Sequence, residues 1–333
     1  MDALSEVLRV IKIDSGIFLN GEFSEPWCVA TPESNVLAPM LARGPGRVIL
    51  YHLLCEGRAY LQLPDGARLE LSAGDLITFP HGDGHVLGAG SGTTPIDVGS
   101  VLPSALEAGL ELLQVGGGGA SSRFISGFLV FDPQLAQTFF AGLPPMIKVS
   151  LRDDVTGQWL EDSLKFSVAH TSNSEAGADA TLTKLSAVLF AETLRQYVRE
   201  LPEGQTGWLA GTRDTAVGKA LTLLHHRHAH RWTVAELAQE TGLSRTVLSE
   251  RFRHFLGDPP MTYLAHWRLR LGARGLAATS HSVAQIATEA GYESEASFNR
   301  AFKRHYGLSP AQYRKDHADV ETNDASERRN GRG

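Results

Sequence analysis

The stretch that decides the fold is VAQIATEAGYESEASFNRAFKRHYGLSPAQY at residues 283–313, and it repeats an earlier stretch, VAELAQETGLSRTVLSERFRHFLGDPPMTY, at residues 234–263. The two align with an offset of 49 residues up to the glycine turn and, after one inserted residue, with an offset of 50. Each predicts a short helix, a turn at Gly242 or Gly291 that suits a positive φ, and a second amphipathic helix. The pattern therefore predicts two helix-turn-helix units.

The second helix of each repeat carries start signals, and a long helix joins the repeats. Ser244 and Ser294 stand where a side-chain oxygen accepts a hydrogen bond from the first helical turn. Residues 261–276, between the repeats, place Leu and Trp at helical spacing and interleave them with arginines. A helix of about 15 residues spans about 22 Å. It can therefore hold the two second helices against major-groove segments about 34 Å apart.

The charge distribution favours a nucleic-acid partner for this part of the chain. The 333 residues carry a formal net charge of -6, yet residues 219–316 hold 14 Lys and Arg against 8 Asp and Glu. A basic module in an acidic chain is the sign expected where protein meets phosphate. Binding of another protein is the alternative for the helical third, and the salt dependence of DNA binding discriminates between the two.

The second repeat resembles the signature of AraC/XylS-type regulators. The resemblance rests on AQIA at 284–287, GYES at 291–294, FNRAFKR at 298–304 and GLSPAQYR at 307–314, with a similar first unit at 232–238 and 244–252. It implies a bacterial regulator that binds double-stranded promoter DNA and controls transcription. RNA polymerase is a further partner if the protein activates. This interpretation predicts no enzymatic activity.

In this interpretation the exposed faces of the two second helices contact DNA. The N-terminal part of such a recognition helix enters the major groove, where arginine pairs best with guanine. The predicted base readers are Arg245, Thr246, Ser249, Glu250, Glu295, Ala296, Asn299 and Arg300. The predicted phosphate contacts are Arg251, Arg253, Lys303 and Arg304. For Glu250 and Glu295, a surface pair at i,i+4 spacing explains the residue equally well.

The N-terminal part predicts a β-barrel. Residues 7–101 read as short extended segments broken by Gly, Pro, Asn and Asp, which is typical of an all-β sandwich or barrel. Residues 58–71 alternate apolar and polar side chains around a turn at Asp65 and Gly66, which predicts a hairpin. Apolar positions between Leu182 and Leu194 predict an amphipathic helix that packs on the barrel or pairs with a second copy in a homodimer.

The predicted fold class is α+β with two domains, a cupin-like barrel with a helical appendage followed by an all-α double helix-turn-helix. The predicted ranges are 1–200 for a sensor and possible dimerisation domain, 201–214 for a linker, 215–316 for the DNA-binding domain and 317–333 for a disordered tail. We expect the first domain to respond to an unknown effector, which is either a small molecule or a redox signal.

A metal ion is one candidate for the barrel. A G-x5-P-x-G-x2-H motif that resembles the second motif of cupin barrels stands at Gly74, Pro80, Gly82 and His85. The first motif departs from the family, because Leu54 occupies the place of the second histidine. The resemblance implies a divalent transition metal with ligands drawn from His52, His85, His81 and Glu56. The alternative is a hydrogen-bonded pair of histidines in a pocket that serves stability or an organic ligand.

The remaining features concern cysteines and compartment. Cys28 and Cys55 are too few for a disulfide framework, and the apolar runs are shorter than the roughly 20 residues of a membrane span. Without the basic start of a signal peptide, the chain is expected to be cytoplasmic with no membrane partner. Both cysteines are candidates for redox sensing, against the alternative of small buried apolar residues. A cupin-type metal-dependent enzyme or ligand-binding protein is the competing function for the whole chain.

Overall fold

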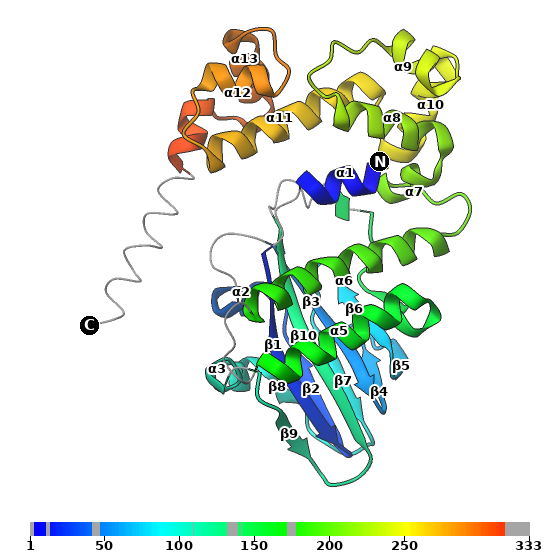
Figure 1. The fold of residues 1–333 in the computed structure, drawn as a ribbon, viewed down its shortest axis with the longest axis vertical. Helices are drawn as coiled ribbons and strands as arrows, with labels where there is room; N and C mark the ends of the chain where they lie inside the picture. Colours follow the sequence, from blue (N-terminus) through cyan, green and yellow to red (C-terminus); the bar gives the residue numbers. More distant parts are fainter. Residues whose placement is uncertain are drawn as a thin grey trace. The chain divides into compact units, whose positions relative to one another are not determined.

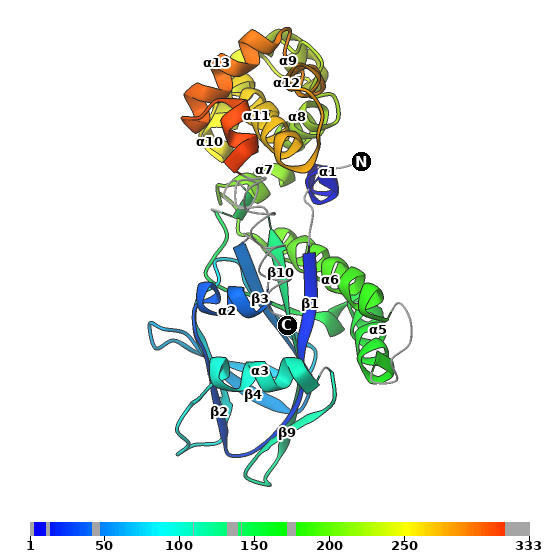
Figure 2. The ribbon, with the colours of Figure 1, turned by 90° about the vertical axis from the view of Figure 1, so that its left-hand side faces the viewer.

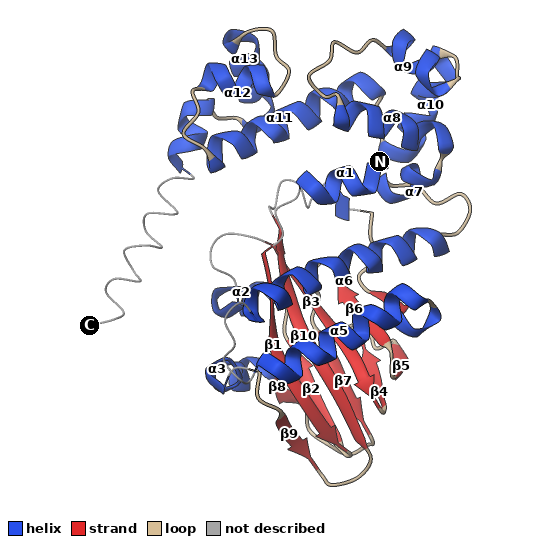
Figure 3. Cartoon of the chain, in the orientation of Figure 1, coloured by secondary structure: helices blue, strands red, loops and turns tan. Residues whose placement is uncertain are grey.

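The computed structural model shows two compact units, residues 11–201 and residues 1–10 with 202–333. The first unit contains the strands, and the second is helical (Figure 3). The predicted α+β class, with an N-terminal β domain and a C-terminal helical domain, is confirmed. The structure describes residues 3–10, 14–41, 47–108, 110–131, 139–140, 142–171 and 178–316. The predicted tail 317–333 lies outside the described residues.

Two sheets form the β part of the first unit (Figure 1). The strands are β1 (Asp14–Ser24), β2 (Trp27–Thr31), β3 (Arg47–Glu56), β4 (Arg58–Gln62), β5 (Arg68–Ser72), β6 (Asp75–Phe79), β7 (His85–Ala89), β8 (Ile96–Asp97), β9 (Leu113–Gly116), β10 (Ser121–Phe131) and β11 (Ile147–Ser150). The six-stranded sheet has the order β11-β6-β3-β10-β1-β9, and the five-stranded sheet has the order β5-β4-β7-β2-β8. Strands distant in sequence are therefore neighbours in both sheets.

The hairpin predicted from alternation is confirmed. Strands β4 and β5 pair antiparallel, with Arg58 opposite Ser72 and Gln62 opposite Arg68. The turn between them uses Gly66 at a φ of +88°, and the Asp65 carboxylate accepts a hydrogen bond from Ala67 N at 2.9 Å. Asp-Gly supplies these conformations at low cost, which is why this short segment was predictable.

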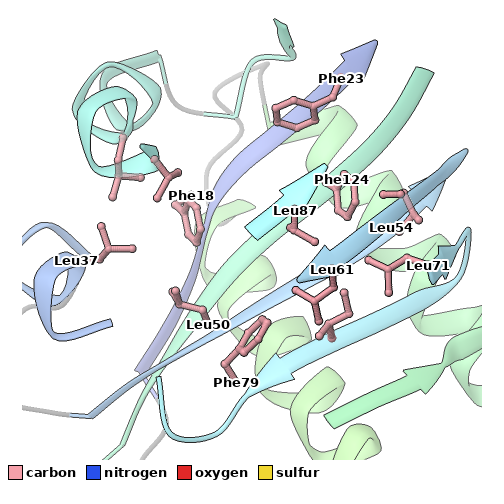
Figure 4. Close-up of a cluster of buried hydrophobic side chains, with 14 of the residues drawn as sticks. Phe18, Phe23, Leu37, Leu50, Leu54, Leu61, Leu71, Phe79, Leu87 and Phe124 are labelled. Atoms are coloured by element: carbon pink, nitrogen blue, oxygen red, sulfur yellow. The ribbon is translucent and has the colours of Figure 1, made fainter. Parts of the chain in front are cut away.

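The apolar core of the first unit is formed by side chains from one face of each sheet (Figure 4). Leu50 and Leu54 alternate along β3 and meet Leu61, Phe79 and Phe124, all buried. Helices α2 (Ser34–Leu41) and α3 (Val98–Ala108) add apolar side chains to the same cluster. Because strand residues alternate between faces, the residue between the two leucines, His52, shares their face.

Two long helices form a second layer against the six-stranded sheet. Helix α6 (Ala178–Glu200) packs on β1, β10 and β11, and α5 (Val155–Thr171) packs on α6 and on the short helix η1 (Leu151–Asp153) (Figure 2). Leu182, Leu189 and Leu194 of α6 are each 2% exposed. Of the two roles expected for this apolar stripe, the structure shows packing within its own unit.

The second unit contains the predicted repeat. Its helices are α1 (Ala3–Val10), α7 (Trp208–Arg213), α8 (Thr215–His226), α9 (Val234–Thr241), α10 (Arg245–Leu256), α11 (Pro260–Ala278), α12 (Val283–Glu289) and α13 (Glu295–Tyr306), with a last helical segment at 310–316. Helices α8, α9 and α10 form one three-helix group, and helices α11, α12 and α13 form the other. Helix α11 therefore belongs to the second group and also connects it to the first. Among the described helices, none combines the length and apolarity that crossing a lipid bilayer requires.

The contacts differ from the predicted ranges at two points. Residues 208–213, inside the predicted linker, form helix α7, because Trp208 and Leu209 find a buried site against α8 and α10. Helix α1, inside the predicted sensor range, packs on α7 and α8 with Ala3 buried. The linker prediction rests on the local chemistry of residues 201–207, and the packing of a single Trp is not visible in composition.

Candidate nucleic-acid interface

The first helix-turn-helix is built from α9, a glycine turn and α10. Gly242 ends α9 at a φ of +72°, and its N–H donates to the Ala238 carbonyl. Ser244 begins α10, and its hydroxyl accepts a hydrogen bond from Val247 N at 3.3 Å. The predicted positive φ and the predicted N-cap are both confirmed. These two features fix the angle between the helices, because one reverses the chain and the other starts the next helix.

The second unit repeats this geometry with one addition. Gly291 has a φ of +86°, and Ser294 accepts a hydrogen bond from Ser297 N at 3.2 Å. A Cβ atom on Gly291 would lie 2.7 Å from Cα of Ala229, closer than real Cβ contacts. Glycine is therefore required here both for its φ and for the close approach of the 229 backbone.

The buried faces of α10 and α13 leave the opposite faces to solvent. Leu248 and Phe252 of α10 and Phe298 and Phe302 of α13 are fully buried. The ring of Phe298 packs against Gly272 of α11, where a Cβ would meet it at 2.6 Å. The core of each unit thus orients its recognition helix, as the apolar periodicity predicted.

The structure exposes most of the predicted readers. The exposed ones are Arg245, Thr246, Glu250, Arg251, Arg253, Glu295, Ala296, Arg300, Lys303 and Arg304. Ser249 and Asn299 are half-buried. Ser249 Oγ donates to the Arg245 carbonyl at 2.8 Å, and Asn299 Oδ1 is buried without a hydrogen-bond partner among the described residues. These two side chains are therefore less accessible to a base edge than the exposed positions.

Arg251 is placed differently from the other predicted phosphate contacts. Its guanidinium donates to Asp214 Oδ2 at 2.8 Å, and the same Asp214 carboxylate caps α8 by accepting from Ala216 N and Val217 N. Arg251 therefore ties the recognition helix α10 to the start of α8. A surface ion pair is weak in water, so this link orients more than it stabilises.

Sequence reasoning missed a buried polar cluster that joins α7, α8 and α11. The Tyr263 hydroxyl accepts a hydrogen bond from Trp208 Nε1 at 2.9 Å and lies 2.8 Å from Nε2 of His225. The His225 ring stacks on Trp267 at 4.3 Å. Burial lowers the pKa of His225 to about 3, with further lowering by the charges of His228 and Arg270. His225 is therefore neutral near pH 7. The sequence feature that could have indicated this cluster was the presence of aromatic residues on three neighbouring segments.

Comparison with known proteins agrees with this arrangement. The chain matches the family model of a helix-turn-helix domain at residues 237–316 and the model named Cupin at residues 2–199. A putative AraC-like transcription regulator of Streptomyces antibioticus is 30% identical over 318 residues, which are 95% of this chain and 99% of that protein. This chain belongs to the AraC-like transcription regulators. It is a DNA-binding regulator of transcription with an N-terminal cupin domain.

Two further relatives of this AraC-like regulator illustrate the range of similarity. The HTH-type transcriptional regulator AlkR of Acinetobacter baylyi is 26% identical over 94% of this chain and 99% of its own length. The solved DNA-binding domain of AdpA, in complex with a target DNA, is 30% identical and covers 31% of this chain and 93% of that chain, with a TM-score of 0.30.

The cupin domain of this AraC-like regulator holds a histidine pair in its interior. Nε2 of His52 lies 2.8 Å from Nε2 of His85, and both side chains are almost completely buried. Nδ1 of His85 faces the Asp83 carbonyl at 3.1 Å, and Nδ1 of His52 faces the Ser126 hydroxyl at 2.7 Å. Because a carbonyl only accepts, Nδ1 of His85 carries a proton, and His52 donates from Nε2 to His85. One neutral arrangement therefore satisfies the whole chain of hydrogen bonds.

Burial keeps this pair uncharged. It lowers the pKa of His85 to about 4, and it lowers the pKa of His52 well below its ordinary value, with the neighbouring His85 adding to the effect. The His85 ring also stacks on Phe79 with centroids 3.7 Å apart. The geometry corresponds to the hydrogen-bonded alternative that the sequence left open for these histidines.

The other predicted metal ligands lie elsewhere. Glu56 is exposed and faces Arg123 at 3.9 Å, and His81 lies 2.8 Å from the Leu143 carbonyl and 3.4 Å from the Arg47 guanidinium. Within the described ranges, no three His, Cys, Asp or Glu side chains form a group that could hold a metal ion. Two imidazoles without a third donor do not fit the three-ligand set of a cupin metal centre.

The two cysteines are free and buried. Burial raises the pKa of the Cys55 thiol to about 11, against the lowering effect of the Lys165 charge. Cys28 accepts a hydrogen bond from the Tyr60 hydroxyl at 3.7 Å. A thiol with a raised pKa is a poor nucleophile near pH 7, so this environment favours the apolar role of Cys55 over redox sensing.

Proposed function

We propose that this regulator binds promoter DNA by inserting α10 and α13 into two successive major-groove segments. One observation carries the proposal: two N-capped helices, each buried on one face and exposed on the other, are joined through α11. Helix α11 has 19 residues and spans about 28 Å, comparable to the roughly 34 Å between successive grooves.

We assign base reading to the exposed positions nearest the helix starts. In the first unit these are Thr246 and Glu250, with Arg245 beside them, and in the second they are Ala296 and Arg300, with Glu295. Arg300 has the fork of donors that pairs with guanine, and Glu250 can accept from cytosine. Ser249 and Asn299, which are half-buried, are the less accessible of the predicted readers.

Phosphate contact is assigned to cations farther along the same helices. Arg253 of α10 and Lys303 and Arg304 of α13 are exposed near the C-terminal ends of the recognition helices. Charge matters more than pattern at such positions, and each contact adds to the salt dependence of binding. Arg251 is assigned a positioning role, because Asp214 already holds its guanidinium.

The test is DNA binding across a salt series, using fragments from upstream of the gene. Arg300→Ala is expected to weaken specific binding by about 1–3 kcal/mol, with less effect on non-specific DNA. Arg68→Ala removes an exposed cation from the cupin domain and serves as the matched control, with no expected change. Equal losses for both variants, or no salt dependence for the wild type, would contradict the assignment.

We assign effector sensing, and not catalysis, to the cupin domain. The neutral His52–His85 pair and the lack of a third metal donor among the described residues support this choice, since a metal-dependent cupin enzyme needs a fuller ligand set. The effector is a small molecule or a redox signal, and the protein acts in the cytoplasm, where RNA polymerase is its partner if it activates. Stoichiometric transition metal with substrate turnover in purified protein would overturn this assignment.

A further inference from the structure

A guanidinium of α11 holds the loop that connects α8 to α9. Nε of Arg268 donates to the His228 carbonyl and Nη2 donates to the His230 carbonyl, both at 2.7 Å. Arg268 is half-buried, so these two bonds replace hydrogen bonds to water. The planar fork of arginine suits two acceptors at once, whereas a lysine ammonium offers a single point charge. Arg268 therefore fixes this loop on α11.

The same loop touches the turn of the second helix-turn-helix unit. Nε2 of His228 lies 3.1 Å from the Glu289 carbonyl oxygen. A Cβ atom on Gly291 would lie 2.7 Å from Cα of Ala229 and 3.0 Å from Nε of Arg268, so loop, turn and α11 meet at one point. Figure 1 shows the connection between α8 and α9 beside the turn between α12 and α13. We refer to these two facing segments as the loop-turn joint, residues 228–231 and 289–293.

The loop is braced within the first unit, so a contact at its tip also restrains α9. Trp232 is buried, and its Nε1 donates to the Arg227 carbonyl at 3.1 Å. Its backbone N donates to the His230 carbonyl at 2.9 Å, and the Arg227 guanidinium lies 5.0 Å from the Trp232 ring. Thr233, the next residue, caps α9 by accepting from Glu236 N. The joint thus connects the turn of the second unit to the start of α9 in the first.

The joint connects the two units at a place beside α11. Two modules that share one helix can move relative to each other about it, as hinged domains do. Helix α11 also contains Gly272 and Gly275, and glycine weakens a helix interior by about 1 kcal/mol relative to alanine. Such motion would require Arg268 to release two carbonyl groups and the Ala229 backbone to leave Gly291. The joint therefore holds the units at one relative orientation.

We propose that the loop-turn joint fixes the distance and angle between α10 and α13, and thereby the number of base pairs between the two elements of the operator, with Arg268 as its positioning residue. The inference rests on the proposed reading of two major-groove segments by these helices. One base pair moves an element by about 3.4 Å along the duplex and turns it by about 35°. A fixed pair of units fits one spacing, whereas a hinged pair fits several.

An ion pair at the rim of the joint supplies the matched control. Arg231 Nη1 lies 3.3 Å from Glu293 Oε1, and the two side chains are 79% and 69% exposed. Exposed pairs of this kind contribute little, because water and salt screen them. Arg231→Ala removes one positive charge, as Arg268→Ala does, yet leaves the bonds that hold the loop on α11.

Binding of the full chain to synthetic sites tests the joint. The probes carry the two elements at the spacing selected from random DNA, or with one base pair inserted or removed between them. The wild type is expected to bind the selected spacing at least tenfold more tightly than either changed spacing. Arg268→Ala is expected to lower this ratio below threefold, Arg268→Lys to give an intermediate ratio, and Arg231→Ala to keep the wild-type ratio. A loss of stability alone lowers binding to every probe equally and leaves the ratio unchanged.

The outcomes separate the joint from the two-groove assignment. A wild type that binds all spacings equally overturns both. A wild type that discriminates, together with an Arg268→Ala protein that discriminates as strongly, overturns the joint and leaves the two-groove assignment standing. An equal loss of discrimination in Arg231→Ala overturns the positioning role of Arg268, because charge alone then explains the effect.

Distances between spin labels test the joint without DNA. Gln239→Cys in α9 and Ala284→Cys in α12 place one label at an exposed position of each unit, and the natural cysteines are buried. The labelled wild type is expected to give one narrow distance distribution, and Arg268→Ala one that is at least twofold broader. Circular dichroism shows whether each variant is folded, and Arg268→Lys carries the comparison if the alanine variant is not. Equal widths in the folded variant and the wild type overturn the proposal.

Discussion

The two helix-turn-helix units share a scaffold and differ in what they present to DNA. Their cores match, since Phe252 and Phe302 occupy equivalent buried positions 50 residues apart. Their exposed faces carry opposite charges at equivalent positions, because Glu250 of the first unit corresponds to Arg300 of the second. The same inversion occurs at the helix start, where an arginine in the first unit corresponds to Glu295. Equivalent positions with opposite charges cannot prefer the same bases, so the repeat predicts one operator with two different halves.

The units also differ in how they are anchored. In the first, α7 packs against α10 and α8, and Arg251 is bonded to Asp214. In the second, Ala301 stands at the position equivalent to Arg251, and a cavity of about 500 Å³ lies between α11 and α13, lined in part by Ala301 and His305. The first unit is thus fastened by an extra helix and an ion pair, whereas the second is fastened by the last helical segment, in which Tyr313 joins the aromatic core and Arg314 donates to the Leu276 carbonyl.

The largest expected contrast concerns the two turn glycines. Gly242→Ala places a Cβ in open space and costs about 1 kcal/mol for its positive φ. Gly291→Ala adds a clash with Ala229 and is expected to cost about 3 kcal/mol in total. Urea unfolding of the full chain measures both. Equal costs would show that the 229 backbone moves aside easily and that the two turns are equivalent.

Acid is expected to act strongly on the first unit. His225 has a pKa of about 3 when folded and about 6.5 when unfolded, so the unfolded chain takes up the proton first as pH falls. The stability from keeping His225 neutral is complete above pH 6.5 and is lost as pH falls towards 3. Between pH 6.5 and 4.5 the free energy of unfolding should decrease by about 2 kcal/mol.

Urea unfolding at several pH values tests the contribution of His225. His225→Gln keeps an acceptor for Tyr263 and removes the titrating group, so its stability should fall less steeply with acid than that of the wild type. The histidine pair in the cupin domain titrates in both proteins and cancels in the comparison. Identical pH dependence for the two proteins would exclude His225 as the acid-sensitive group.

The two N-cap serines are expected to contribute equally to the free energy of unfolding. Ser244→Ala and Ser294→Ala each remove one side-chain acceptor from the first turn of a recognition helix, at a cost of about 1 kcal/mol. Thermal unfolding of each variant measures this, and Ser280→Ala, at an exposed position outside the helices, should change stability by less than about 0.5 kcal/mol. A large difference between the cap variants would mean that one unit tolerates fraying and the other does not.

The smallest effect is expected from the acidic reader. Glu250→Ala removes a carboxylate from the exposed face of α10 and should strengthen binding to non-specific DNA by on the order of 0.5 kcal/mol, because repulsion from phosphate is relieved. Competition binding with random-sequence DNA measures this change. Weaker non-specific binding would mean that Glu250 organises neighbouring cations and does not face the duplex.

The sequence was most informative where local chemistry decides structure. Gly242, Ser244, Gly291 and Ser294 each have a backbone or capping role that a residue type reveals by itself, and the repeat fixed their register. The hairpin turn at Gly66 was predictable for the same reason. Burial of the recognition-helix cores followed from periodicity. None of these features required knowledge of distant contacts.

The features that the sequence did not reveal depend on contacts between distant segments. The sequence predicts Arg251 as a phosphate contact, whereas the structure places Asp214 beside it. The sequence places Trp208 in a linker, whereas the structure packs it beside Tyr263 and His225. The pairing of His52 with His85 was left open for a similar reason, because strand alternation gives the face of a residue but not its neighbour across the barrel.

Selection of preferred sites from random DNA, by the wild type, Arg300→Ala and Glu250→Ala, tests the central claim most directly. The account predicts an asymmetric site with two unlike elements about ten base pairs apart. Arg300→Ala should relax preference in one element only, and Glu250→Ala in the other only. A single element, two identical elements, or loss of preference in both elements from one substitution would contradict the reading of two grooves by two different helices.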